Sequence, residues 1–185
     1  SEPLVDPCCG SGVLLIEAAL TALQQAPGLE RRFALEGWAD FQPNLWDKEV
    51  DRARQRRRGD FTLPPLLGIE TDPTIADQAR ANVEAAGLSG VIRICTGSFQ
   101  AKALPDGPGV LVCNPPYGQR IGDEQELDAL YGALGQFVRQ EASGWQLWLL
   151  SGNPKLTGAL RLKASRRIPV SNGGIDCRWL QYEIR

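Results

Sequence analysis

The chain has 185 residues and a mass of 20.2 kDa, which suits one domain with a sizeable core. Its hydrophobic content of 43% and charged content of 23% are ordinary for a globular protein, and its net charge is −2. It has no histidine, and its five cysteines lack the spacing of metal ligands, which excludes a zinc site, a Ser/His/Asp triad and a histidine general base within this chain. Because no apolar run is long enough to span a bilayer, and because three of the five cysteines lie in or beside apolar strands as small core residues, we expect a protein of the reducing cytoplasm that uses no metal and no membrane.

Basic residues gather in two zones of this acidic chain. Residues 151–185 carry seven Lys or Arg and two Asp or Glu, a net charge of +5, and the run 52–58 holds five arginines. Such zones can steer a polyanion toward one face of a protein. For a single basic run a solvated helix face is the commoner explanation, and both explanations stay open.

The first predicted unit is a short strand at Pro3–Val5, a glycine-rich turn over residues 6–12 and a largely buried helix over Val13–Leu23. A strand, a glycine turn and a helix form the first half of a nucleotide-binding unit, because glycine lets the backbone pass close to a ligand. A dinucleotide fingerprint requires a third glycine where Leu15 stands, which argues against a nicotinamide-type cofactor.

Residues 28–65 interrupt the α/β alternation and are predicted to form an insertion. A helix is expected over about Leu45–Arg58. Trp38, Phe41 and Trp46 are expected to pack the insertion against the body, which is a commoner role for such residues than base stacking. Contact with a partner stays open, because long insertions in compact domains often carry function.

The alternation resumes with a strand at Leu66–Glu70, a helix that begins at Asp72-Pro73 and continues to about Ala86, and a strand at Val91–Cys95. Glu70 stands at the end of the second strand, where nucleotide-binding sheets place an acid that accepts hydrogen bonds from the ribose hydroxyls. Asp72 is expected to cap the following helix.

The stretch Val110–Cys113 predicts a buried strand that stops at Pro115 and Pro116, which cannot extend a sheet. Asn114 is thereby held at the carboxyl end of the strand, the edge of an α/β sheet where ligands bind. An amide, two rigid prolines and Tyr117 favour a small site for a flat, amino-bearing group. A Pro-Pro turn covered by the tyrosine is the alternative.

The rest of the chain predicts a long helix over Asp123–Glu141, a strand over Trp145–Leu150 and a short helix that begins at Pro154. Two strands follow, over Ala164–Ile168 and Asp176–Ile184, and a turn at residues 171–174 joins them. The fold class is therefore α/β, with a mostly parallel seven-stranded sheet, one antiparallel strand and helices on both faces.

Four segments, in this order, carry a resemblance to a known family: residues 6–12 (DPCCGSG), 68–73 (GIETDP), 114–118 (NPPYG) and 172–177 (NGGIDC). Together they resemble the bacterial large-subunit (23S) ribosomal RNA guanine-N2 methyltransferases and their relatives once described as N6-adenine DNA methylases. The resemblance covers nearly the whole chain. It implies a Rossmann-like class I methyltransferase domain over residues 1–185, S-adenosylmethionine as cofactor, ribosomal RNA as partner, and an N-terminal THUMP-type RNA-binding domain that is absent from this chain.

The resemblance also implies the site residues. The catalytic set is Asn114, Pro115, Pro116 and Tyr117, and the cofactor-binding set is Asp6, Pro7, Cys8, Cys9, Gly10, Ser11, Gly12, Glu70, Thr71, Ser98 and Asn114. The chain departs from the family at Val13, where threonine is frequent, and at Ser98, where an acid commonly holds the adenine amino group.

An exocyclic base amine is a poor nucleophile because its lone pair is delocalised into the ring. The Asn114 side-chain oxygen and the Pro115 carbonyl are expected to accept its two N–H bonds, while Tyr117 stacks on the base. The target is expected to be N2 of guanine. The alternatives are N6 of adenine in DNA or RNA, a glutamine amide of a protein and, in a different class, a catalytically silent RNA-binding module.

Overall fold

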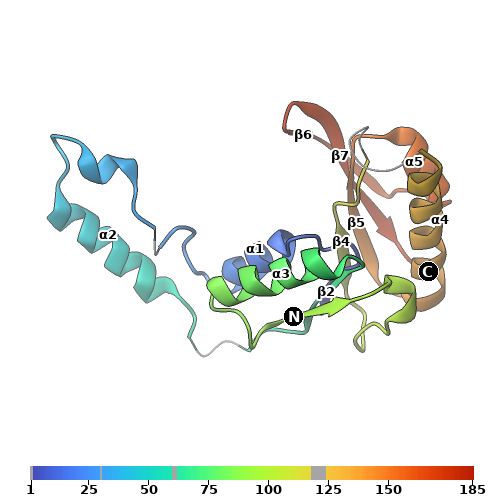
Figure 1. Cartoon of the computed structure of the whole chain (residues 1–185), viewed down its shortest axis with the longest axis horizontal. Coiled ribbons are helices and arrows are strands. Elements are labelled where there is room, and N and C mark those ends of the chain that lie inside the picture. Colours follow the sequence, from blue (N-terminus) through green and yellow to red (C-terminus); the bar gives the residue numbers. More distant parts are fainter. Residues whose placement is uncertain (1, 30, 60–61, 118–123) are drawn as a thin grey trace.

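The computed structural model describes residues 2–29, 31–59, 62–117 and 124–185. A seven-stranded sheet runs through the molecule in the order β3-β2-β1-β4-β5-β7-β6 (Figure 1). Its strands are β1 (Leu4–Asp6), β2 (Leu66–Glu70), β3 (Ile92–Thr96), β4 (Val110–Cys113), β5 (Gln146–Ser151), β6 (Arg166–Asn172) and β7 (Ile175–Glu183). Strands β1 to β5 pair in parallel, and β7 is antiparallel to both β5 and β6, which confirms the expected sheet with one antiparallel strand.

The centre of the sheet is the short strand β1. Leu4 lies between Leu66 of β2 and Val110 of β4, so strands from distant parts of the sequence flank it on both sides. The chain winds from β1 outward to β2 and β3 and then returns to β4. This reversal places the carboxyl ends of β1 and β4 side by side, which is where open α/β sheets bind ligands.

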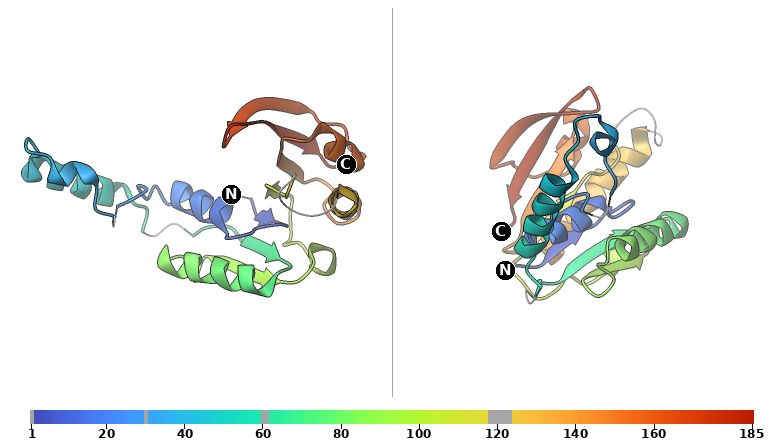
Figure 2. Two further views of the ribbon diagram at one scale, coloured as in Figure 1. Left: turned by 45° about the horizontal axis from the view of Figure 1, so that its top comes forward. Right: turned by 90° about the vertical axis from the view of Figure 1, so that its left-hand side faces the viewer.

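Helices cover both faces of the sheet, as expected (Figures 1 and 2). The helices α1 (Val13–Ala22) and α3 (Pro73–Ala85) pack on one face, and α4 (Glu124–Glu141) and α5 (Pro154–Ala159) on the other. In the second layer α4 packs closely against the end of α5 at Gly135, where a Cβ atom would lie 2.2 Å from the Leu160 carbonyl oxygen. Within the described part of the chain, no helix is both long enough and apolar enough to cross a lipid bilayer.

The insertion departs from expectation. Its helix α2 (Pro43–Arg56) begins two residues before the predicted start, because a proline is well suited to the first helical turn. The segment extends away from the body in Figure 1, Trp38 is 66% exposed, and the Phe33 and Trp46 rings meet edge to face with centroids 5.5 Å apart. The prediction that the insertion's aromatic residues pack it against the body is therefore wrong, since their partners lie within the insertion itself.

The terminal hairpin is longer than predicted on its first strand. Gly173 and Gly174 have φ angles of +58° and +82°, and they form a two-residue turn, so that β6 reaches Asn172. Pro169 lies inside β6, where it is tolerated because this strand forms the edge of the sheet.

Candidate active site

A cleft with a volume of about 960 Å³ opens at the carboxyl ends of β1, β2 and β4. Three groups of predicted residues line it. The turn after β1 contributes Pro7, Cys8 and Gly10, the end of β2 contributes Glu70 and Thr71, and the end of β4 contributes residues 114–117. The structure therefore brings together, at one edge of the sheet, segments that are more than forty residues apart in the sequence.

The other predicted members of the turn hold it in place from behind. The Ser11 carbonyl accepts a hydrogen bond of 2.9 Å from the Asn82 amide of α3, and Gly12, at φ +83°, lies against Ala79 of the same helix. The Cys9 side chain is buried, and a Cβ at Gly68 would lie 2.9 Å from its sulfur. Cys9, Ser11 and Gly12 thus do not line the cleft, and Gly68 is needed for the close packing of the turn on β2.

Asp6 also lies behind the cleft wall. Its carboxyl is almost completely buried, and its Oδ1 atom accepts a hydrogen bond of 3.0 Å from the Cys8 amide. Burial raises the pKa of Asp6 to about 7; the Cys8 hydrogen bond opposes this rise, and the charge of Glu70 adds to it. The carboxyl therefore fixes the conformation of the turn at the cost of burying a group that ionises near neutral pH.

The Glu70 carboxylate joins the turn to β2. Its Oε2 atom accepts from the Gly10 amide at 3.0 Å, and its Oε1 atom accepts from the Asp72 amide at 3.0 Å and from the Thr71 hydroxyl at 3.3 Å. A carboxylate offers about four acceptor positions, so capacity remains for a hydroxyl group in the cleft. Asp72 itself accepts from the Thr74 amide at 2.8 Å, which confirms that it caps α3.

The segment after β4 combines a rigid and an exposed part. Pro115 is buried, whereas Asn114 is exposed at the cleft. The Tyr117 hydroxyl accepts hydrogen bonds from the Asn172 amide at 2.7 Å and from the Cys177 thiol at 3.6 Å. Burial raises the pKa of Tyr117, so its hydroxyl stays neutral. The β6–β7 hairpin thereby holds the tyrosine ring beside Asn114.

Several cleft residues were not predicted from the sequence. Ile75 of α3, Leu130 of α4 and Phe99, which follows β3, give the cleft an apolar side. Ile175 comes from the terminal hairpin. Ser98, in contrast, does not line the cleft, because its hydroxyl accepts from the Gln100 amide at 3.2 Å and caps the 3₁₀ helix η2 (Phe99–Ala101). Phe99, the next residue in the sequence, lines the cleft instead.

The family of RMKL-like methyltransferase domains matches residues 1–181 of this sequence. The chain belongs to this family. Two relatives named ribosomal RNA large subunit methyltransferase K/L support the assignment. The Marinomonas protein is 40% identical over 190 residues and the Chromohalobacter salexigens protein 41% identical over 193, in alignments that cover 98% and 99% of this chain. The RMKL-like domain described here spans 26% of the length of each of these relatives.

Solved structures agree with the family assignment. The crystal structure of SMU.472 complexed with SAH superposes with a TM-score of 0.92 at 29% identity, and that of a possible methylase from Clostridium difficile 630 with a TM-score of 0.91 at 30% identity. Each match covers 100% of this chain and 48% of the solved chain. The RMKL-like domain therefore has the Rossmann-like methyltransferase fold predicted from the sequence.

Proposed function

We propose that this RMKL-like domain transfers a methyl group from S-adenosylmethionine to an exocyclic amino group of a base in ribosomal RNA, namely N2 of guanine. The observation that carries the proposal is the position of Asn114 and Tyr117 at the cleft that also holds Glu70. Relatives that are 40% identical are named as ribosomal RNA methyltransferases, and SMU.472 binds SAH, the product of this cofactor.

The cleft fits S-adenosylmethionine in size and in chemistry. Its volume of about 960 Å³ lies within the range of small-molecule sites. Glu70 would hold the ribose hydroxyls, Ile75 and Phe99 would enclose the adenine ring, and the backbone of Pro7 to Gly10 would hold the methionine part. When bound, this cofactor supplies an electrophilic methyl group on a positively charged sulfur. Because Asp6, Cys9, Ser11, Gly12 and Ser98 do not line the cleft, we propose that they act by supporting these contact residues.

The residues after β4 would prepare the acceptor amine. The side-chain oxygen of Asn114 and the carbonyl of Pro115 each accept one hydrogen bond from an N–H group of the amine. These two bonds orient the nitrogen lone pair and stabilise the positive charge that develops on the nitrogen. Tyr117 stacks on the extruded base. Most of the acceleration comes from positioning. The methylated nitrogen carries one proton too many, which it would release to water, so no strong base is needed, in keeping with a chain that has no histidine.

Recognition of the whole RNA would involve more than this domain. The chain spans 26% of the length of the relatives named ribosomal RNA large subunit methyltransferase K/L, and the family resemblance implies a THUMP-type RNA-binding domain ahead of the catalytic one. We propose that such a domain delivers the RNA, while residues 1–185 bind the cofactor and the target base.

The Asn114→Ala variant tests the role of the amide. We expect methyl transfer to fall by about two to three orders of magnitude, the usual loss when one group that stabilises transition-state charge is removed. Binding of S-adenosylmethionine, followed by calorimetry, should stay nearly intact. Asn44→Ala, in the exposed start of α2, is the matched control and should change neither quantity. An equal loss of transfer and of cofactor binding would contradict the assigned role.

The target atom is tested by labelled methyl transfer onto ribosomal RNA that lacks the modification, followed by nucleoside analysis. N2-methylguanosine is the expected product. N6-methyladenosine would overturn the choice of atom, and transfer to a protein glutamine would overturn the choice of substrate. A chain that shows no heat on titration with S-adenosylmethionine would be a silent RNA-binding module.

A further inference from the structure

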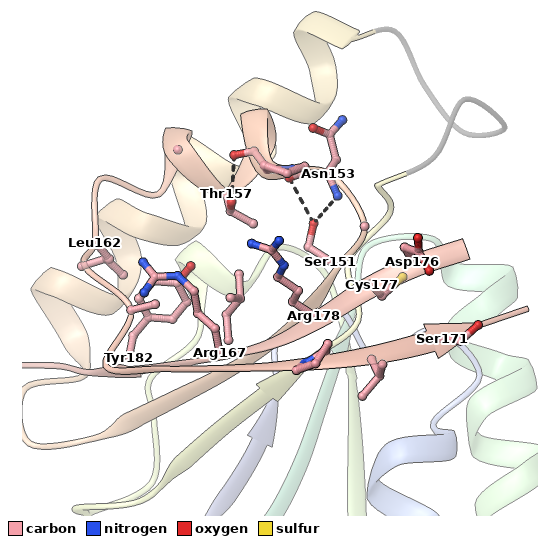
Figure 3. A pocket seen from close by; sticks show the side chains of 17 residues that line it. Ser151, Asn153, Thr157, Leu162, Arg167, Ser171, Asp176, Cys177, Arg178 and Tyr182 are labelled. Carbon is pink, nitrogen blue, oxygen red and sulfur yellow. Dashed lines mark hydrogen bonds between the residues drawn. The ribbon is translucent and has the colours of Figure 1, made fainter. Parts of the chain in front are cut away.

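A second hollow, with a volume of about 870 Å³, lies behind the terminal hairpin between the end of β5, the helix α5 and the strands β6 and β7. Figure 3 shows the side chains of Arg167 and Arg178 pointing from the two strands into this space, below the loop that carries Ser151. The register of the hairpin pairs Pro169 with Arg178, so the two arginines lie diagonally across one face of the ribbon. The hollow is thus lined by two arginines from the same face of the hairpin.

Arg167 and Arg178 have no carboxylate partner among the described residues, whereas four other arginines do. Arg32, Arg52, Arg54 and Arg80 each lie within 4 Å of an acid on their own or an adjoining turn. Within the described ranges, no ion pair involves Arg167 or Arg178. One acid, Asp176, lies among the residues that line the hollow, and the net charge of its lining is therefore +1. A site of this charge favours an anion.

Three neutral polar side chains of the hollow, from the segment after β5, are already bonded within that segment. The Ser151 hydroxyl accepts from the Asn153 amide at 3.1 Å, the Asn153 side chain accepts from the Lys155 amide at 3.0 Å, and the Thr157 hydroxyl donates to the Pro154 carbonyl at 2.9 Å. The arginines are the groups left with several donors to offer. Guanidinium groups match a phosphate bidentately, and most hydrogen bonds between proteins and nucleic acids go to the phosphate and sugar.

The hollow is separated from the active-site cleft by a thin partition. Cys177 lines the hollow, and its sulfur lies 3.6 Å from the Tyr117 hydroxyl on the cleft side. Gly152 also lines the hollow, and a Cβ atom there would lie 3.3 Å from the Tyr117 ring. Ile175 lines the cleft, while Asp176, the next residue, lines the hollow. If the target base of an RNA chain stacks on Tyr117, the sugar-phosphate backbone of that RNA would therefore lie close to this hollow.

We propose that Arg167 and Arg178 bind the phosphate of a nucleotide adjacent to the target base. This inference rests on the proposed function, because it takes the substrate to be RNA. A base that has left its stack needs its backbone held in register with the catalytic groups, and contacts to phosphate supply register without reading sequence. A volume of about 870 Å³ accommodates a nucleotide. The site acts in positioning the substrate and takes no part in the chemical step.

The test compares the double variant Arg167→Gln/Arg178→Gln with Arg166→Gln. Arg166 is the neighbouring, exposed arginine on β6 and does not line the hollow. Binding of a fluorescent, mixed-sequence single-stranded RNA of twelve nucleotides is followed by anisotropy over a range of salt. We expect the double variant to bind this RNA at least tenfold more weakly, with a salt slope smaller by about 0.7, since each phosphate contact in single-stranded RNA contributes about 0.7. The control should match the wild type.

Two further measurements separate positioning from misfolding. The KM for ribosomal RNA should rise in the double variant by the same factor as the loss of binding, while kcat and the calorimetric affinity for S-adenosylhomocysteine stay unchanged. Arg178→Lys keeps the charge and should bind RNA within about threefold of the wild type, because lysine remains a phosphate ligand.

The outcomes distinguish this site from the proposed function. A double variant that matches Arg166→Gln overturns the phosphate site and leaves ribosomal RNA methylation standing. A wild-type chain that binds no RNA at any salt, yet transfers methyl groups to ribosomal RNA, has the same consequence. A protein that joins this domain to its RNA-binding domain and neither binds nor methylates ribosomal RNA refutes the proposed function and the site together.

Discussion

Replacing Asp6 with asparagine should change how the stability of the domain depends on pH. The carboxyl is almost completely buried, and its pKa is raised from 3.8 to about 7, chiefly by burial. Asparagine has nearly the same shape, and its side-chain oxygen can still accept the hydrogen bond from the Cys8 amide. The substitution therefore removes the ionisation of this residue while it retains the contact that fixes the turn.

The direction of the effect follows from proton linkage. In the wild type the folded state holds a proton on Asp6 at pH values where the unfolded state has lost it, so folding becomes less favourable as the pH rises from 3.8 to about 7. Because the pKa of Asp6 rises from 3.8 to about 7 on folding, this ionisation can change the free energy of unfolding by about 4 kcal/mol at most. Between pH 4.5 and pH 8 the free energy of unfolding of the wild type should fall by about 3 kcal/mol through this residue, and the Asp6→Asn variant should not show this fall.

Urea denaturation at pH 4.5 and at pH 8, followed by tryptophan fluorescence, measures this difference. The free energy of unfolding of Asp6→Asn minus that of the wild type should increase by about 3 kcal/mol between the two pH values. Asp106→Asn removes the same charge from an exposed loop, and its difference should change by less than about 0.5 kcal/mol. A difference for Asp6→Asn that is constant, or that falls with pH, would refute the reasoning.

Three further predictions follow from the packing of the domain. Gly135→Ala should destabilise it by about 1–3 kcal/mol or more, because the new methyl group meets a backbone carbonyl oxygen, whereas Gly132→Ala on the same helix meets nothing and should stabilise it by about 0.5–1 kcal/mol; urea denaturation measures both. Asn172→Ala should lower kcat about threefold to tenfold through loss of the hydrogen bond to Tyr117, with cofactor affinity unchanged by calorimetry. Cys8 should remain unmodified by iodoacetamide at pH 8 in peptide maps, although it lines the cleft, because burial and the nearby acids raise the pKa of its thiol.

Each of these has a clear contrary result. Equal stability of the two glycine variants would mean that α4 and the end of α5 are less closely packed than described. If Asn172→Ala and Tyr117→Phe lower kcat additively in a double-mutant cycle, then the hydrogen bond between the two residues is not the cause. Rapid alkylation of Cys8 would show that its thiolate is accessible at pH 8.

The regular part of the fold could be predicted from the sequence because its boundaries have strong local causes. Strands β2 and β4 have the predicted limits, since short apolar runs end at residues that cannot continue a strand, such as Pro115. The hairpin turn was predicted in place, although its first strand is longer. The insertion was not predicted correctly, because residue spacing does not specify which surface an aromatic ring such as Trp46 will meet.

The site was predicted in part for a similar reason. Residues within short motifs, such as Glu70 and Asn114, were located because glycines, prolines and strand ends fix them locally. Ile75 and Leu130 line the same cleft but come from helix faces, where an apolar residue has the same spacing whether it faces the core or a ligand. Only the arrangement of the helices on the sheet shows whether such a residue faces the core or a ligand.

The position of β1 in the middle of the sheet has a consequence for folding. This three-residue strand pairs with Leu66 on one side and with Val110 on the other, so both of its neighbours are non-local. Closing loops of this length carries an entropic cost before the contacts repay it, and domains with such high contact order fold slowly. We therefore expect the turn over residues 6–12, although it precedes β2 and β4 in the sequence, to be among the last segments of the domain to acquire its native shape, after residue 113 has been synthesised.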